Sequence, residues 1–263
     1  MSKSAIARLQ GAVSYAFLLG LLLAVIFPFY WMTVTSLKSE DQMRSLVSMF
    51  WPSPFVVDNY RHLLQKTDFV AWFGNSVFVA VSSTVLATAI GTIGAYSLAR
   101  LRFLGRGFMA SATLITYLVP PSILFIPLYA QIRNLGLADS LTGLIVAYPS
   151  FTVPFVTWLL MGYFESIPVE LEESAMIDGA TRFGAFWRVV LPLSAPGVLA
   201  AGLYAFTQSW NEFLYALVFT TGDVYGWGFL MARAVLTTLP VIAAYIYLQK
   251  YMVEGLTAGS VKG

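Results

Sequence analysis

Five polar side chains near the end of an apolar segment could bind a solute. Four of them recur at helical spacing and share one face: Tyr204, Gln208, Asn211 and Tyr215. The fifth, Glu212, lies one turn beyond Gln208. A carboxylate near the bilayer centre costs roughly 2.5 to 3.5 kcal/mol, so it should face protein or water. Amides, a carboxylate and tyrosine rings suit a neutral polyhydroxylated solute, although interhelical hydrogen bonds explain this stripe equally well.

Residues 166–193 form a polar, acid-rich segment between two long apolar runs. Pro168 suits the first position of a short helix, where its missing N–H costs nothing. The early turns of this helix contain three acidic residues, Glu170, Glu172 and Glu173. The helix dipole favours negative charge at that end. One face of this helix holds Leu171, Ala175 and Gly179. Two of these residues are small and would let another protein approach closely.

Gly179 can end this first helix in the left-handed conformation, and Thr181 can cap a second helix. The second helix should stop at Pro192, which lacks the N–H that a helix interior needs. The segment therefore predicts a helix-turn-helix hairpin that docks on a partner protein.

The composition is that of a membrane protein. Of 263 residues, 58% are hydrophobic and 11% are charged, against roughly 25% charged in a soluble domain. The net charge of +2 and the scattered basic residues argue against binding of nucleic acid.

The chain lacks the residues that catalysis would need. It has no cysteine and one histidine, His62, which stands beside charged residues and is expected to be solvated, so we expect no metal or redox site. No lysine follows a glycine, which excludes a P-loop, and the common hydrolase motifs are absent. We expect no catalysis and no cofactor in this chain.

Six runs are long and apolar enough to cross a bilayer, which takes roughly 20 residues each. They are residues 12–34, 72–95, 108–128, 141–163, 195–219 and 227–248. The predicted fold is therefore an all-α membrane domain covering residues 1–263, with the hairpin between spans four and five and a tail at 250–263.

The basic residues predict the orientation by the positive-inside rule. With the N-terminus in the cytoplasm, the short outer loops hold only Arg133 and Arg233. The inner side then holds Lys3, Arg8, Arg100, Arg102, Arg106, Arg182, Arg188, Lys250 and Lys262. Both termini and the hairpin are expected in the cytoplasm.

Two features of the spans concern packing. Small residues recur every fourth position along the second span, at Ser83, Ala87, Gly91 and Ala95, and predict close contact with another helix. Prolines are expected to kink the third, fourth and sixth spans, at Pro120, Pro121, Pro127, Pro149, Pro154 and Pro240.

The hairpin resembles the ABC importer permeases, specifically the carbohydrate class to which the smaller membrane subunit of the maltose transporter belongs. The family hallmark is Glu-Ala-Ala, three residues, Gly, nine residues and Ile-x-Leu-Pro. The matching residues here are Glu173-Ser174-Ala175, Gly179 and Val189-Val190-Leu191-Pro192, with mild departures at Ser174 and Val189. Further similar stretches are Asn75-Ser76, Trp210-Asn211-Glu212-Phe213 and the terminal residues 255–263.

This resemblance implies an importer of a sugar in a bacterial or archaeal plasma membrane. Its partners would be a second homologous permease, a dimer of cytoplasmic ABC ATPases that bind ATP and Mg²⁺, and an extracytoplasmic solute-binding protein. The hairpin would enter a cleft on the ATPase through Glu173, Ser174, Ala175, Asp178, Gly179, Leu191 and Pro192. The tail would make a second contact through Leu256, Thr257 and Lys262.

Three alternatives stay open on the sequence alone. An ABC permease for another small polar solute would keep the same hairpin spacing. An ion-coupled secondary carrier would need no ATPase, but we detect no inverted repeats, which are typical of such carriers. A membrane-embedded enzyme would need a nucleophile or a metal site, against which the shortage of His and Cys argues. The segment between Phe219 and Trp227 is shorter than is usual in the class, whose members use it to help contact the binding protein.

Overall fold

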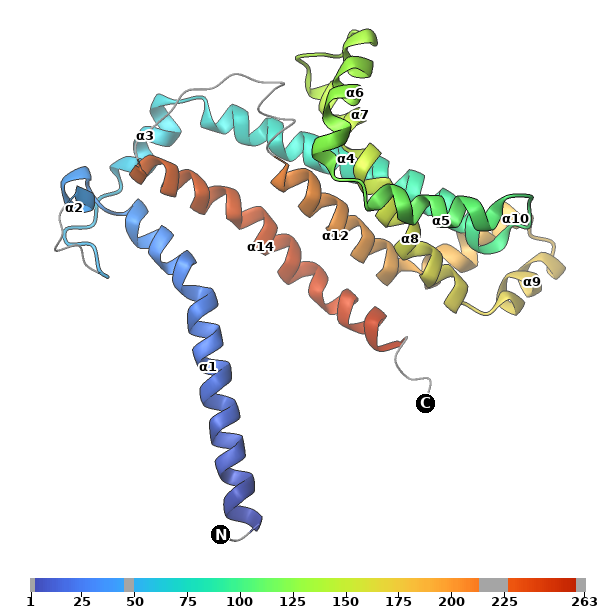
Figure 1. The fold of residues 1–263 in the computed structure, drawn as a ribbon, viewed down its shortest axis with the longest axis horizontal. Helices are drawn as coiled ribbons and strands as arrows, with labels where there is room; N and C mark the ends of the chain where they lie inside the picture. Colours follow the sequence, from blue (N-terminus) through green and yellow to red (C-terminus); the bar gives the residue numbers. More distant parts are fainter. Residues whose placement is uncertain (1–2, 45–49, 213–226, 259–263) are drawn as a thin grey trace. The chain divides into compact units, whose positions relative to one another are not determined.

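The computed structural model describes residues 3–44, 50–212 and 227–258, and all regular secondary structure in these ranges is helical (Figure 1). This confirms the predicted all-α class. The chain divides into two compact units, Met1–Ala71 with Asp223–Pro240, and Trp72–Gly222 with Val241–Gly263.

The helices follow one another along the described parts of the chain. In order they are α1 (Lys3–Ser36), α2 (Glu40–Arg44), α3 (Asp58–Lys66), α4 (Phe69–Arg100), α5 (Arg106–Tyr117), α6 (Pro121–Asn134), α7 (Leu141–Ala147), α8 (Pro149–Ser166), α9 (Val169–Ile177), α10 (Arg182–Ala185), the π-helical turn η1 (Phe186–Val190), α11 (Leu191–Leu193), α12 (Ala195–Asn211) and α14 (Trp227–Ala258).

Among the described residues, four helical stretches are long and apolar enough to cross a membrane: Gln10–Ser36, Phe69–Arg100, Leu141–Ser166 and Met231–Gln249. They coincide with the first, second, fourth and sixth predicted spans. Two bent pairs raise the number to six if each pair counts as one span. One pair is α5 with α6, and the other joins Arg182–Leu193 to α12.

The third predicted span, 108–128, is broken rather than merely kinked. Helix α5 ends at Tyr117, and α6 begins at Pro121 with its axis turned by 102°. The cause is the Pro120-Pro121 pair, because a residue before proline is driven out of the α region. Pro120 accordingly has an extended backbone, with ψ of 132°. Pro127 is accommodated inside α6.

The fifth predicted span, 195–219, also ends earlier than expected. Helix α12 stops at Asn211, and Glu212 is extended with ψ of 118°. The remainder of the predicted span lies outside the described residues. Glu212 therefore does not continue the helical register that placed it one turn beyond Gln208.

The first unit contains a lysine held away from solvent. Lys38 is 3% exposed, and its Nζ lies 4.7 Å above the centre of the Trp31 ring. The Asn59 amide donates hydrogen bonds of 3.0 Å to the carbonyl oxygens of both Ser36 and Lys38. Burial lowers the pKa of Lys38. These contacts fasten the end of α1 to α3, whereas the apolar residues along α1 are exposed within the chain and need lipid or another protein to cover them.

The core of the second unit forms where α8 packs against both α5 and α12. The predicted small-residue stripe on α4 is confirmed, since all four of its residues are buried. At Gly91 a Cβ atom would lie 2.4 Å from Cγ1 of Val156 on α8, so the two backbones approach as closely as only glycine permits. At Gly197 a Cβ would similarly overlap the Tyr163 ring, which brings α12 close to α8.

Replacing Gly91 by alanine should destabilise this unit by about 1–3 kcal/mol, the usual cost of overpacking, because the new methyl group overlaps Val156. The matched control is Gly94→Ala on the same helix, whose Cβ would meet Thr157 at an ordinary 3.5 Å. The melting temperature of the purified protein should fall for G91A, stay unchanged for G94A, and recover in G91A with Val156→Ala. Equal melting temperatures for the two single variants would contradict the close approach.

Candidate functional site

The first arm of the hairpin is helix α9, which begins at Val169 with Pro168 as its N-cap, one residue later than predicted. It ends at Ile177, and Gly179 follows in the expected left-handed conformation, with φ of +92°. The Gly179 N–H donates to the Met176 carbonyl at 3.1 Å, and the Ala180 N–H donates to the Ala175 carbonyl at 3.0 Å. This pair of bonds is a Schellman motif, which satisfies the last carbonyls of the helix.

The second arm begins with the predicted cap and ends differently from the prediction. Thr181 Oγ1 accepts a hydrogen bond of 3.1 Å from the Gly184 N–H. The helix then widens into η1, and Pro192 lies in the first turn of α11, where its missing N–H is tolerated. The break comes only at Ser194, after which α12 turns away by 76°. The helix-turn-helix form is present, and Pro192 is not its terminus.

Most of the predicted docking residues face outward. The exposed ones are Glu173, Ser174, Asp178, Gly179 and Pro192. Ala175 is partly buried, and Leu191 packs against the core of the second unit. The hairpin thus offers an exposed surface around its first arm and its turn.

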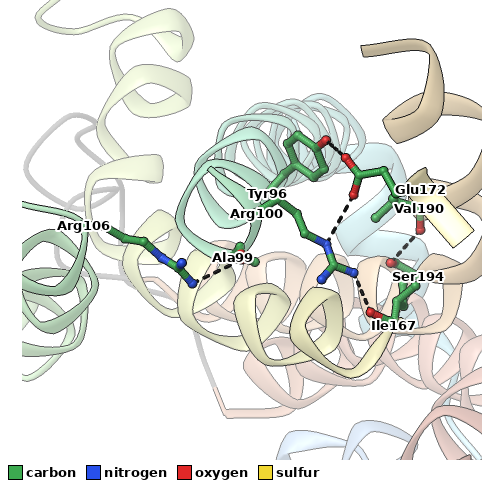
Figure 2. Close-up of polar contacts among 8 residues, drawn as sticks. All are labelled: Tyr96, Ala99, Arg100, Arg106, Ile167, Glu172, Val190 and Ser194. Atoms are coloured by element: carbon green, nitrogen blue, oxygen red, sulfur yellow. Dashed lines mark hydrogen bonds and ion pairs between the residues drawn. The ribbon is translucent and has the colours of Figure 1, made fainter. Parts of the chain in front are cut away.

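Glu172, directly before the exposed Glu173, is only 3% exposed. Figure 2 shows it beside Tyr96 and Arg100. The Tyr96 hydroxyl of α4 donates a hydrogen bond to its Oε1. Arg100, the last residue of α4, places Nε 3.4 Å from its Oε2, and the two charged side chains are 6% and 4% exposed. The first arm is therefore attached to α4 by a buried ion pair.

Arg100 has a second partner at the end of α8. Its Nη2 donates to the Ile167 carbonyl at 2.6 Å, as Figure 2 shows. Ile167 is the C-cap residue of α8, where unpaired helix carbonyls favour a cation. One guanidinium group thus joins the ends of α4 and α8 to α9.

Tyr96 connects α4 to the second arm as well. Its ring centroid lies 4.5 Å from that of Phe186 in η1 and 6.2 Å from that of Phe164 in α8. The hydroxyl of Tyr96 binds the first arm while its ring contacts the second arm. We call the three residues Tyr96, Arg100 and Glu172 the buried joint.

Sequence reasoning missed this joint. It assigned Glu172 to the helix dipole and Arg100 to membrane orientation, and it gave Tyr96 no role. The spacing of four residues between Tyr96 and Arg100 does signal a shared helical face. No local pattern reveals the partner of that face, which lies 76 residues beyond Tyr96.

The predicted solute stripe is brought together only in part. The Gln208 amide donates to the Tyr204 hydroxyl at 3.2 Å, and the Tyr204 ring lies 4.0 Å from Phe155 of α8. Phe155 also neighbours Tyr117 of α5 at 5.0 Å and Trp158 at 5.9 Å. These four rings with Gln208 form what we call the aromatic cluster, whose α5 and α8 members the sequence did not reveal.

The other members of the stripe are placed elsewhere. Glu212 Oε2 lies 3.5 Å from the hydroxyl of Tyr148, a buried residue at the start of α8. Its carboxylate therefore meets protein, one of the two environments that were expected. Asn211 is exposed, and Tyr215 lies outside the described residues. Of the predicted tail contacts, the side chains of Leu256 and Thr257 and all of Lys262 are likewise outside the described part of the chain.

Known proteins match this chain over most of its length. Residues 87–249 match the family described as "Binding-protein-dependent transport system inner membrane component". The chain belongs to this family. It is 35% identical to the trehalose/maltose transport system permease protein MalG of Thermococcus litoralis, over 92% of this chain and 94% of that protein. It is 33% identical to the diacetylchitobiose uptake system permease protein DasC of Streptomyces coelicolor, over 92% and 94%.

A solved structure shows the same fold. A chain from a bacterial ABC transporter involved in the import of the acidic polysaccharide alginate superposes with a TM-score of 0.81 at 24% identity, covering 95% of this chain and 98% of the other. The resemblance to ABC importer permeases that the hairpin spacing predicted is confirmed. This family member is a multi-pass membrane protein, and its relatives are permease subunits.

The turn of the hairpin should depend on Gly179. Alanine there would have open space around its Cβ but would have to adopt a left-handed φ, which costs about 1–2 kcal/mol. The control Gly162→Ala, in α8, also has open space and an ordinary helical backbone. We expect G179A to lower the melting temperature, Gly179→Asn to lower it less because Asn tolerates this conformation, and G162A not to lower it. Equal melting temperatures for G179A and G162A would show that the left-handed backbone at position 179 does not destabilise the alanine variant.

Proposed function

We propose that this chain is a permease subunit of an ATP-driven ABC importer, and that with a second, homologous permease it forms an alternating-access path for a sugar. The observation that carries the proposal is near full-length similarity to permeases named for trehalose/maltose and diacetylchitobiose uptake. The exposed hairpin supports a role in docking to an ATPase, and the aromatic cluster supports a role in contacting the sugar. The substrate is a mono-, di- or oligosaccharide.

The hairpin is the proposed contact to a dimer of cytoplasmic ABC ATPases, which bind the ATP and Mg²⁺ that this non-catalytic subunit does not. Exposed carboxylates at Glu173 and Asp178, next to the rigid turn at Gly179, support this role. An extracytoplasmic solute-binding protein delivers the sugar. The hairpin and both termini lie on the cytoplasmic side of a bacterial or archaeal plasma membrane, and the tail at 250–263 adds a second ATPase contact.

The aromatic cluster is the proposed place of sugar contact. Tyr117, Trp158 and Gln208 are at least partly open to solvent or to a partner, whereas Phe155 contacts the rings of both Tyr117 and Tyr204. Ring faces suit the C–H surfaces of a sugar, and the Gln208 amide and the tyrosine hydroxyls suit its hydroxyl groups. Helices α5, α8 and α12 all contribute, so a change in their packing would alter the cluster.

Reversing the charge of Glu173 should weaken ATPase docking. We expect Glu173→Lys to lower ATP-dependent sugar uptake by the reconstituted complex at least about tenfold, which corresponds to 1.4 kcal/mol of lost docking energy. The amount of ATPase that copurifies should fall with it. Glu165→Lys reverses an exposed charge on α8 and should keep both values. Wild-type uptake and copurification for E173K would refute docking at this face.

Shortening Phe155 should weaken sugar handling without affecting ATPase docking. Phe155→Ala removes the ring that contacts both Tyr117 and Tyr204. We expect KM for uptake to rise about fivefold to tenfold, in line with about 1 kcal/mol for an aromatic contact. Phe78→Ala, which removes an exposed ring from α4, is the control and should keep KM. Kinetics of labelled-sugar uptake give both values. An unchanged KM for F155A would remove the cluster from the sugar path.

A further inference from the structure

The first arm of the hairpin carries two adjacent carboxylates in opposite surroundings. Glu173 is exposed, and Glu172 is buried against α4. Successive residues on a helix point about 100° apart, so one side of α9 can be fixed to its own chain while the other stays open. The two residues therefore have separable tasks.

The fixed side is held by an interaction that is costly to break. Arg100 and Glu172 are both almost fully buried and lie 3.4 Å apart. Removing either partner of a buried pair leaves an uncompensated charge in a poorly solvating interior. Tyr96 adds a hydrogen bond to the same carboxylate. Displacing α9 from the end of α4 would require all of these contacts to be lost together.

The same three residues connect the hairpin to the walls of the proposed path. Arg100 binds the C-cap carbonyl of α8 at Ile167, and Tyr96 contacts the second arm at Phe186. Helix α8 contacts α4 without a gap at Gly91 and carries Phe155 of the aromatic cluster. A displacement of α9 is thus passed to the ends of α4 and α8.

We propose that Glu172, held by Tyr96 and Arg100, is a positioning residue that transmits movement of the docked hairpin to α4 and α8. The inference rests on the proposed function, because it takes the exposed side of the hairpin as the ATPase contact. Loss of the buried carboxylate leaves docking at Glu173 intact and uncouples ATP hydrolysis from transport.

The test uses the complete complex in proteoliposomes and measures sugar transported per ATP hydrolysed. Glu172→Gln keeps the size of the side chain and removes its charge. We expect ATPase copurification at the wild-type level and a transport-to-hydrolysis ratio about tenfold lower. The matched control is Glu165→Gln, which breaks the neighbouring Arg106–Glu165 pair of 3.6 Å, whose side chains are 37% and 50% exposed. That exposed pair should contribute little, so E165Q keeps the wild-type ratio.

A double-mutant comparison separates a joint from independent structural effects. If Glu172 acts through Arg100, the variant R100Q/E172Q has a ratio no lower than that of the worse single variant. The effects of E165Q and E172Q should instead multiply. Multiplying effects of R100Q and E172Q would overturn the proposal.

The other outcomes are also decisive. A wild-type complex without ATP-driven uptake would refute the proposed function itself. A working wild type with an unchanged ratio for E172Q would refute only the joint, and so would loss of the ATPase from E172Q, since Glu172 would then merely shape the docking face. If the E172Q chain does not fold, Tyr96→Phe is used instead, because it removes only the hydroxyl and keeps the ring contacts. A wild-type ratio for Y96F would then overturn the proposal.

Discussion

The arrangement of the hairpin depends on one constraint, that charge removed from water must be paired. Arg100 and Glu172 pair their charges at 3.4 Å, although Nε and Oε2 do not form a hydrogen bond. The hydrogen bonds of the two groups go instead to the Tyr96 hydroxyl and the Ile167 carbonyl. A nine-residue helix such as α9 is marginal by itself in water. Its position is therefore set by this pairing and by the packing of η1 against the Tyr96 ring, more than by its own helix propensity.

Close packing makes such a joint effective beyond its immediate neighbours. In lipid, the hydrophobic effect contributes little to the association of helices. Van der Waals contact between closely approaching backbones has to stabilise it instead. Gly91 allows such contact between α4 and α8, and Gly197 allows it between α12 and α8. Close-packed helices transmit a displacement at one end because no void absorbs it. The buried joint fixes α9 to the ends of α4 and α8. The two glycines keep α4 and α12 in close contact with α8.

Local patterns predicted the features that depend on local physics. Apolar length identified four of the six predicted spans as single helical stretches in the described residues. The positive φ of Gly179 and the Thr181 cap were expected from residue type, and the small-residue stripe is buried as expected. The break of the third span has a local cause, the Pro120-Pro121 pair, whose effect was underestimated as a kink. Glu172 could not be placed in this way. Its burial follows from residues 72 and 76 positions away, which no periodicity relates to it.

The two neighbouring glutamates show how one short helix can serve two surfaces. Had both carboxylates been exposed, α9 would lie on the surface of its own chain without a carboxylate bond to α4. Had both been buried, α4 would have needed a second cation, and none of its residues beyond Arg100 carries a positive charge. The helical rotation of about 100° per residue lets one carboxylate be buried while the next one is exposed. A single arginine, Arg100, is then enough to pair the buried charge. The exposed glutamate carries no such constraint, whereas the buried one is bound to the geometry of α4 and α8.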